Sequence, residues 1–439
     1  MNLTPKETVK FLDEYVIGQA QAKKLIAIAL RNRYRRMKLS AEMQDDIIPK
    51  NILMIGSTGV GKTEIARRLA KMLGFPFVKV EASKYTEVGF VGRDVESMVR
   101  DLANAALNLV KNEQRQKNQD KIDEFIEEKI LEKLLPPLPK GVSEEKQDEY
   151  KNSLEKMRKK LKNGDLDESV IEIEISQNMF DTNPNLPPEM GAMQDIVKVI
   201  GVGSKRVKKE MKIKDAKNAL QNEASEKILD MESIKTEALR RAENEGIIFI
   251  DEIDKIAVSS ANSNRQDPSK EGVQRDLLPI VEGSNVQTKI GNLKTDYILF
   301  IAAGAFHLSK PSDLIPELQG RFPLRVELDS LTSKALYEIL TRPKNSLLRQ
   351  YKELLKTEGV NLEFDDEAIK HIADIASRAN EEMQDIGARR LHTVIEKLLE
   401  DLSFEADEYA GKDFVVTKEL VDEKLSDIVE NKDLARYIL

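Results

Sequence analysis

Short apolar runs of four or five residues recur in the N-terminal part and in the middle of the chain, separated by stretches with helical spacing of apolar positions. Runs without polar alternation indicate strands that are buried on both faces, as in a parallel sheet covered by helices. Strands that alternate with helices predict an α/β core. The predicted strands are residues 51–55, 77–80, 246–250, 298–302 and 324–328.

The pattern changes between residues 110 and 241, where long charged helical segments replace the apolar runs. Ile122, Ile126 and Ile130 fall on one face of a helix, whereas residues 170–175 alternate as a strand does. This stretch therefore predicts an inserted domain that is mostly helical. A basic cluster follows at residues 205–209, and in so charged a segment it is more typical of a solvated face than of a nucleic-acid site.

After residue 331 the spacing is helical again, with one short predicted strand at residues 412–417. This stretch predicts a small helical C-terminal domain. The predicted division is a discontinuous core of residues 1–109 and 242–330, an inserted domain of residues 110–241 and a C-terminal domain of residues 331–439.

Composition excludes several classes of function. The chain has no cysteine, which excludes disulfides, thiolate metal sites and a cysteine nucleophile, and fits a reducing cytoplasm. Its 69 basic and 77 acidic residues nearly cancel, to a net charge of −8, so no global basic field favours a nucleic-acid partner. No apolar run approaches the length of a bilayer span, so we expect no membrane partner either.

Residues 56–63 read Gly-Ser-Thr-Gly-Val-Gly-Lys-Thr, the full phosphate-loop pattern, between a predicted strand and a predicted helix. In this motif the backbone amides cradle phosphates at the positive end of a helix, the lysine (Lys62) reaches the β and γ oxygens, and the hydroxyl of Thr63 coordinates Mg²⁺. An ordinary glycine-rich turn would not need this strand and helix around it. We therefore predict an ATP and Mg²⁺ site.

The predicted strand at residues 246–250 leads directly into two carboxylates, Asp251 and Glu252. Beside a phosphate loop, Asp251 is the expected second Mg²⁺ ligand and Glu252 the group that polarises the attacking water. Asp254 follows three residues after Asp251, and both a metal-ligand role and a surface or capping role remain open for it.

Several segments together resemble the HslU (ClpY) family, the AAA+ unfoldase subunits of the HslUV protease. The resemblance covers nearly the whole chain and is weakest in the predicted insertion. The matching segments are residues 15–19 (YVIGQ), the phosphate loop, residues 249–255 (FIDEIDK), residues 271–279 (EGVQRDLLP), residues 387–391 (GARRL) and the C-terminal residues 433–439 (DLARYIL).

The resemblance implies further contacts with ATP. Ile17 would line the adenine pocket, and Arg389 would be the sensor arginine that reaches the nucleotide. Glu317 and Arg321 would face the nucleotide of a neighbouring subunit, with Arg321 as the arginine finger. Read without the family, Arg321 would be a surface arginine. The predicted ATP-binding residues are Ile17, Gly59, Val60, Gly61, Lys62, Thr63, Glu64, Asp251, Glu317 and Arg389, with Lys62, Glu252 and Arg321 as catalytic residues.

Two other segments match functional motifs of the family. Gly89, Phe90, Val91 and Gly92 match the pore loop that grips substrate, with Phe90 where the family typically has tyrosine. An aromatic ring without the hydroxyl retains apolar contact and loses a hydrogen bond. The tail would dock on the protease through Arg436, Tyr437, Ile438 and Leu439. The plain alternatives are a flexible turn and an ordinary helix end.

Taken together, we expect an ATP-dependent protein unfoldase and translocase in a homo-oligomeric ring, six subunits being the family expectation. It would feed unfolded or tagged proteins to a separate HslV-type threonine protease, activate that protease, and have chaperone activity. Three alternatives remain open. One is a nucleic-acid motor or loader on the same AAA+ core, another is an ATP-binding protein that scarcely hydrolyses, and the third is a ClpX-like unfoldase, which the absence of cysteine for a zinc module disfavours.

Overall fold

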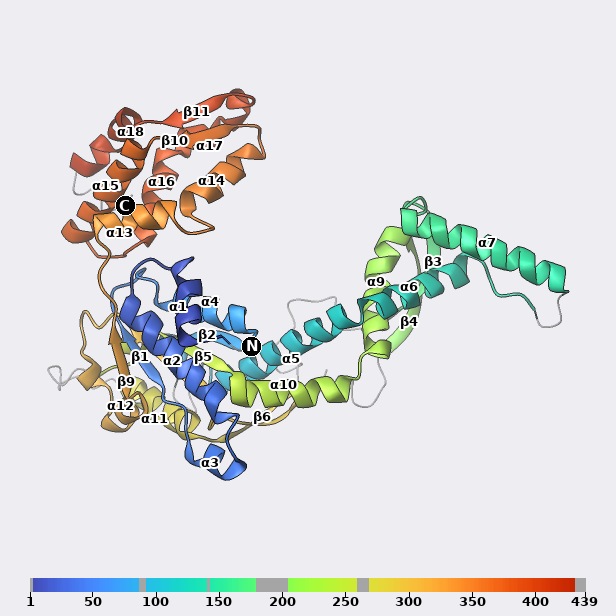
Figure 1. The fold of residues 1–439 in the computed structure, drawn as a ribbon, viewed down its shortest axis with the longest axis horizontal. Helices are drawn as coiled ribbons and strands as arrows, with labels where there is room; N and C mark the ends of the chain where they lie inside the picture. The colour runs from blue at the N-terminus through green and yellow to red at the C-terminus, as the bar shows by residue number, and fades with distance from the viewer. Residues whose placement is uncertain (1–2, 87–91, 140–142, 179–203, 259–267, 431–439) are drawn as a thin grey trace. The chain divides into compact units, whose positions relative to one another are not determined.

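The computed structural model of the 439-residue chain describes residues 3–86, 92–139, 143–178, 204–258 and 268–430 (Figure 1). The chain forms two compact units, one of residues Met1–Leu109 and Ala238–Leu439, the other of residues Val110–Glu237. Two helices cross the boundary between the units, α5 (Ser97–Lys117) and α10 (Met231–Glu245).

The first unit is built on a five-stranded parallel sheet in the order β2-β5-β8-β1-β9. This arrangement confirms the predicted α/β core. All strands run the same way, so their carboxyl ends meet at one edge of the sheet, where the loops can form a site. The strands are β1 (Ile52–Ile55), β2 (Phe77–Glu81), β5 (Ile247–Asp251), β8 (Leu299–Gly304) and β9 (Leu324–Glu327).

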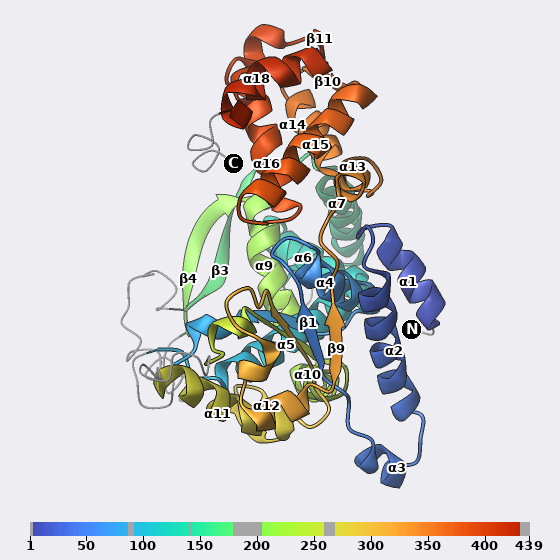
Figure 2. The same cartoon turned by 90° about the vertical axis from the view of Figure 1, so that its left-hand side faces the viewer.

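Helices near the N-terminus cover one face of the sheet, and Figure 2 shows two of them, α1 and α2, running together beside β9. Apolar side chains of α1 (Pro5–Asp13), α2 (Ala20–Arg36) and α4 (Lys62–Leu73) share a hydrophobic core with β1, β5, β8 and β9. Thr4 and Glu7 form a capping box at the start of α1, and Gly74 in the left-handed region ends α4.

The remaining elements of the central part of this unit are short, apart from the 15-residue helix α11. They are α3 (Ala41–Asp46), η1 (Ala82–Lys84), η2 (Ile253–Lys255), α11 (Pro268–Glu282), the antiparallel pair β6 (Asn285–Thr288) and β7 (Gly291–Lys294), η4 (Pro311–Asp313) and α12 (Pro316–Arg321).

The chain after residue 331 belongs to the first unit and has a hydrophobic core of its own, which includes Leu336, Ile372 and Leu425. The predicted strand at 412–417 coincides with β11, which pairs in parallel with β10. The elements are α13 (Ser333–Thr341), α14 (Leu347–Lys356), β10 (Asn361–Phe364), α15 (Asp366–Glu382), α16 (Arg389–Leu398), α17 (Glu400–Phe404), η5 (Ala406–Tyr409), β11 (Asp413–Val416) and α18 (Lys418–Glu430).

In the ranges that the structure describes, the second unit is mostly helical with one antiparallel hairpin. Ile122, Ile126 and Ile130 lie on one helical face and are buried against Ile171 and Ile173 of the hairpin. Its elements are the C-terminal part of α5, α6 (Gln119–Leu134), α7 (Glu144–Asn163), β3 (Val170–Asn178), β4 (Ser204–Lys212), α9 (Ile213–Ile228) and the start of α10. Over both units, none of the helices within the described ranges is long and apolar enough to cross a bilayer.

Candidate active site

The phosphate loop joins the carboxyl end of β1 to the start of α4. Gly59 and Gly61 have φ angles of 80° and 104°, which residues with a side chain rarely adopt. A Cβ at Gly59 would lie 2.1 Å from the carbonyl oxygen of Ile386, so the loop has no room for a larger residue there. The loop therefore exposes its backbone at the positive end of a helix, which suits an anionic ligand.

Lys62, the first residue of α4, is only 8% exposed. Its ammonium donates to the carbonyl oxygens of Ser57, at 2.8 Å, and of Gly56. Burial lowers the pKa of Lys62, and the nearby carboxylate of Asp251 opposes that shift. A cation held inside the loop in this way can neutralise phosphate oxygens.

Thr63 and Asp251 come together although they are far apart in the sequence. The Thr63 hydroxyl donates to Asp251 Oδ2 at 3.5 Å, and the ammonium of Lys79 forms an ion pair with the same oxygen at 2.7 Å. A hydroxyl and a carboxylate oxygen side by side are hard ligands of the kind that Mg²⁺ prefers. With the open phosphate loop beside them, these residues fit a Mg²⁺–nucleotide complex.

Glu252 follows Asp251 with a φ of 56°, the left-handed region that a glutamate seldom adopts. Its carboxylate accepts a hydrogen bond of 3.2 Å from the Ser83 hydroxyl in η1. Uncommon backbone conformations of this kind cluster at functional sites. The turn directs the Glu252 side chain to the pocket beside Asp251.

One pocket of about 930 Å³ brings several of these charged groups together, whereas Thr63, Lys79 and Ser83 are not among its lining residues. Lys62, Asp251 and Glu252 line it from the sheet side, and Arg389 lines it from the start of α16. The adjacent Arg390 is 3% exposed and donates to Gln384 and Asn380 within its own region, so of these two arginines only Arg389 faces the pocket.

Other predicted site residues lie outside the lining of this pocket. Glu317 and Arg321 are exposed on α12, where Arg321 forms an ion pair of 2.8 Å with Glu282. Ile17 is half-buried. The preceding residue, Val16, lies close to the phosphate loop, because a Cβ placed on Gly61 would be 3.3 Å from the Val16 side chain. Within the P-loop region, Val60 is buried in the core and Glu64 pairs with Arg68 at 2.5 Å.

The substrate-contacting predictions fall mainly outside the described residues. Gly89, Phe90 and Val91 lie outside them, as do Arg436, Tyr437, Ile438 and Leu439 of the tail. Gly92 lies within the described residues and is exposed. Next to it, the Thr86 N–H donates to the carbonyl oxygen of Arg93 at 3.3 Å.

Sequence reasoning did not identify Lys79 and Ser83. They lie on β2 and η1, and only the pairing of β2 with β5 brings them to Asp251 and Glu252. No local signal marks them. Asp254, whose role was left open, does line the pocket, and its spacing three residues after Asp251 was an available signal.

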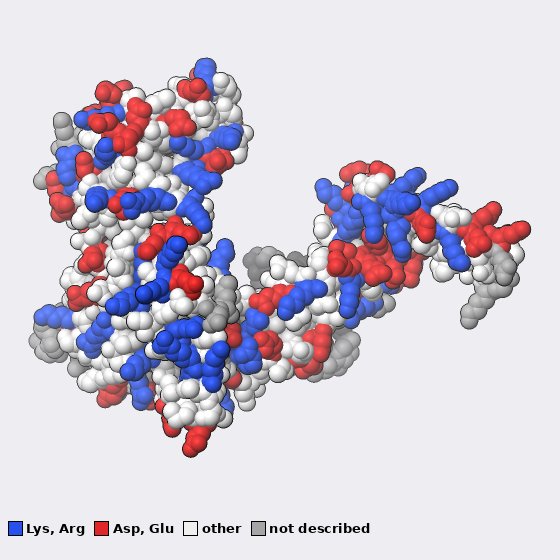
Figure 3. Space-filling model, in the orientation of Figure 1, with Lys and Arg blue, Asp and Glu red and all other residues white. Residues whose placement is uncertain are grey.

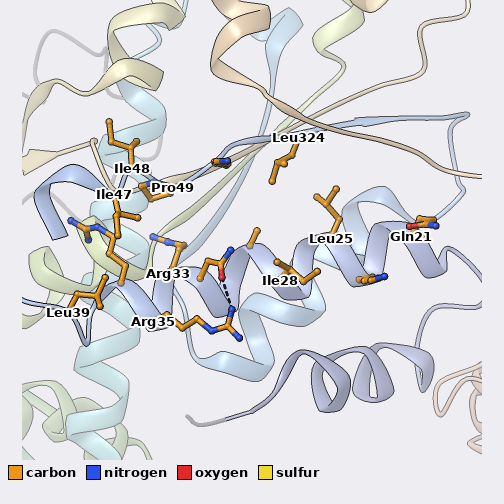
Figure 4. Close-up of a pocket in the computed structure, with 15 residues that line it drawn as sticks. Gln21, Leu25, Ile28, Arg33, Arg35, Leu39, Ile47, Ile48, Pro49 and Leu324 are labelled. Carbon is orange, nitrogen blue, oxygen red and sulfur yellow. Dashed lines mark hydrogen bonds between the residues drawn. The ribbon is translucent and has the colours of Figure 1, made fainter. Parts of the chain in front are cut away.

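A second cavity, of about 570 Å³, lies beside α2 and contains none of the predicted site residues (Figure 4). Leu25, Ile28, Leu39 and Ile48 line it together with basic side chains such as Arg35. We therefore place the chemistry at the pocket between the phosphate loop and Arg389.

Comparison with known proteins agrees with this geometry. Residues 52–200 match the ATPase family associated with various cellular activities (AAA), residues 168–325 match an AAA domain (Cdc48 subfamily), and residues 331–406 match the C-terminal, D2-small domain of ClpB protein. These matches cover the sheet, the pocket and the region that carries Arg389.

Two curated relatives named "ATP-dependent protease ATPase subunit HslU" align over the full chain. The protein of Campylobacter jejuni subsp. jejuni serotype O:2 is 89% identical over 439 residues, covering 100% of both chains. The protein of Helicobacter pylori is 62% identical over 440 residues, covering 100% of this chain and 99% of the relative.

Proposed function

Because the chain belongs to the HslU family of ATPase subunits of ATP-dependent proteases, we propose that it uses ATP hydrolysis to unfold proteins and thread them to a separate HslV-type protease. The chain is an AAA ATPase that binds nucleotide and serves an ATP-dependent protease. The observation that carries the mechanism is the convergence of Lys62, Asp251, Glu252 and Arg389 on one pocket.

The roles of the pocket residues follow from their chemistry. Bound ATP with Mg²⁺ supplies the γ-phosphoryl group that is transferred to water. Lys62 neutralises the β and γ oxygens, and the oxygens of Thr63 and Asp251 are the protein ligands for Mg²⁺. Glu252 accepts a proton from the attacking water on one carboxylate oxygen, while the Ser83 hydroxyl donates to the other, Oε2.

Arg321 and Glu317 act in a neighbouring copy of the chain. Both are exposed on α12 and neither lines the pocket of its own chain, which supports a role in trans. An arginine finger supplied by a neighbour stabilises charge on the transferring group and is worth about 10³ to 10⁵ in rate. We therefore propose a homo-oligomeric ring, six subunits being the family expectation, in the cytoplasm.

Apart from Gly92, the proposed substrate path uses segments outside the described residues. Gly89–Gly92 would grip unfolded or tagged proteins with Phe90, and Arg436–Leu439 would dock on the HslV-type protease. Target domains are stable by only about 5 to 15 kcal/mol, so repeated pulling on one end suffices to open them. The same action without protease would give chaperone activity.

A nucleic-acid motor on the same core is the second candidate. On the face in Figure 3, basic and acidic side chains intermingle over the first unit, without the continuous basic field that phosphate backbones require. This surface favours the protein substrate.

The test mixes the purified chain with an HslV-type protease and a folded fluorescent protein, with and without ATP. The comparison includes full-length chain, Lys62→Ala, Glu252→Gln and a chain ending at Arg436. We expect loss of fluorescence and release of peptides only with ATP and the full-length chain. Glu252→Gln should bind ATP but hydrolyse it at least about 100-fold more slowly.

Full ATPase activity without activation of the protease would contradict the proposed function. Stimulation of ATP hydrolysis by single- or double-stranded DNA rather than by an unfolded protein would then favour the nucleic-acid motor. Unchanged degradation by the chain ending at Arg436 would contradict tail docking alone.

A further inference from the structure

Gln19 ends the segment Tyr15–Gln19, in which the family resemblance gives a role only to Ile17. Gln19 is 5% exposed and is the N-cap residue directly before α2, with a φ of 56°, a conformation unusual for a glutamine. A buried polar side chain on such a backbone needs partners. Its partners lie 310 residues away in the sequence.

The side-chain amide of Gln19 holds both main-chain groups of Asp329. Gln19 Nε2 donates to the carbonyl oxygen of Asp329 at 2.8 Å, and the Asp329 N–H donates to Gln19 Oε1 at 3.0 Å. Asp329 lies between the end of β9 at Glu327 and the start of α13 at Ser333. We call this pair of hydrogen bonds between Gln19 and Asp329 the clamp. It fixes the connection that leads from the sheet to the C-terminal helices.

The same N-terminal segment contacts the phosphate-loop region. The Tyr15 ring lies 4.6 Å from the guanidinium of Arg68 on α4, and Val16 packs beside Gly61. Lys23, which is 1% exposed, donates to the carbonyl of Val16 and forms an ion pair with Asp13 at 2.6 Å. The segment is thus held against α4 and the end of the phosphate loop at Gly61.

A further contact lies beyond the connection. The carboxylate of Glu14 forms an ion pair of 2.6 Å with Lys344, and its main-chain carbonyl accepts from the Lys344 N–H at 3.4 Å. Lys344 lies between α13 and α14, in the region that also carries Arg389. The chain around residues 14–19 therefore contacts the phosphate-loop region, the connection at Asp329 and the turn after α13 at Lys344.

We propose that Gln19 is a positioning residue that makes the C-terminal region follow the state of the nucleotide pocket. With the clamp formed, a shift of residues 15–18 on ATP binding pulls on Asp329 and so sets the distance between Arg389 and the phosphate loop. Without the clamp, ATP still binds at Lys62, but the C-terminal region closes incompletely. This inference rests on the proposed function only in that ATP binds at the phosphate loop.

The test uses spin labels, which the absence of native cysteine makes specific. Labels on Lys71→Cys in α4 and Arg378→Cys in α15, both exposed, report the distance across the connection in the full chain. The labelled chain is mixed with excess unlabelled chain, so that pairs within one subunit dominate. Distances are measured with and without ATP in a Glu252→Gln background, which slows hydrolysis.

The central variant is Gln19→Gly, because glycine accepts the left-handed backbone and removes only the clamp. Gln19→Asn keeps an amide and tolerates the backbone but is one methylene shorter. Arg33→Met, which removes buried hydrogen bonds away from Asp329, controls for a general loss of stability with the clamp intact. ATP saturation of every variant is checked with a fluorescent analogue.

We expect ATP to narrow the distribution of distances between the two labels in the Glu252→Gln parent chain and in Arg33→Met. In Gln19→Gly, the distribution should stay broad at saturating ATP. In the chain that retains Glu252, Gln19→Gly should lower kcat for ATP hydrolysis about tenfold, with a smaller change in KM. The kcat of Gln19→Asn should lie between that of Gln19→Gly and that of the unchanged chain. Narrowing by ATP in Gln19→Gly equal to that of the parent would overturn the inference. A chain that closes on ATP but never activates the protease would instead contradict the proposed function.

Discussion

At the scale of single residues, the pocket depends on atoms with little space around them. Gly59 faces the carbonyl of Ile386, and the Ala388 N–H donates to the carbonyl of Gly59 at 3.3 Å. The phosphate loop and the region before α16 therefore touch through their backbones. A side chain at position 59 would therefore clash with the backbone of residues 386–388.

Gly59→Ala should reduce ATP hydrolysis by at least about tenfold, because its Cβ would push residues 386–389 away from the loop. Gly411→Ala is the matched control. Gly411 also has a positive φ, of 77°, but has open space around it. Both substitutions cost roughly 1–2 kcal/mol of backbone strain. Equal ATPase rates in the two variants would rule out the steric explanation.

Arg389 and Arg390 are neighbours with different surroundings, and their substitutions should separate. Arg389→Ala should raise KM for ATP about tenfold and leave the melting temperature unchanged, because Arg389 is exposed and lines the pocket. Arg390→Ala should cost roughly 2 kcal/mol of stability, because Arg390 is buried and donates to Gln384 and Asn380. Nucleotide titration and thermal unfolding together distinguish the two, and a reversed pattern would show that the roles are exchanged.

At the scale of elements, α2 is tied to the end of α10 by one buried side chain. The Arg33 guanidinium donates to the carbonyl oxygens of Asn244 at 2.8 Å, Gly246 at 3.0 Å and Tyr297 at 2.7 Å. The last carbonyls of a helix have no partner within the helix, so an arginine placed there supplies the missing hydrogen-bond donors. It also fixes the start of β5, the strand that ends at Asp251.

Arg33→Met should destabilise the chain by about 3 kcal/mol, because it leaves several buried carbonyls without a donor. Arg35→Met on the same helix should change stability by less than about 0.5 kcal/mol, because Arg35 is exposed and donates only to Asn32 at 3.0 Å among the contacts of the described chain. Urea unfolding measures both. Similar losses for the two arginines would contradict this role of Arg33.

At the scale of the whole molecule, the three predicted catalytic residues of one chain do not lie at one pocket. Lys62 and Glu252 line the pocket, whereas Arg321 is exposed and paired with Glu282 on another part of the same unit. If the proposed ring forms, each pocket takes its arginine from the next copy, and activity depends on assembly.

This dependence predicts complementation between two inactive variants. Lys62→Ala and Arg321→Ala chains should each hydrolyse ATP at least about 1,000-fold more slowly than the parent. Rings assembled from a mixture should regain part of the activity, because some pockets then combine an intact Lys62 with an intact Arg321 from the neighbour. Absence of any recovery in mixed rings of normal size would contradict a role of Arg321 in trans.

The sequence alone determined the parts of this protein that are contiguous in the chain. The phosphate loop, the strand that ends at Asp251 and Glu252, and the order of strands and helices follow from local spacing, because a helix, a strand and a tight loop are formed by residues close in sequence. The α/β core and the positions of the five strands of its sheet were predicted from this pattern and match the structure, whereas β4, β6, β7 and β10 were not predicted.

Only the tertiary structure decided which distant residues meet. The pairing of β2 with β5 places Lys79 and Ser83 at the two carboxylates, and the Gln19 amide reaches Asp329 across 310 residues. The tertiary structure also places Arg389 at the pocket and its neighbour Arg390 in the interior. These contacts depend on how buried surfaces and hydrogen-bond partners are satisfied over the whole fold, and no local spacing encodes that choice.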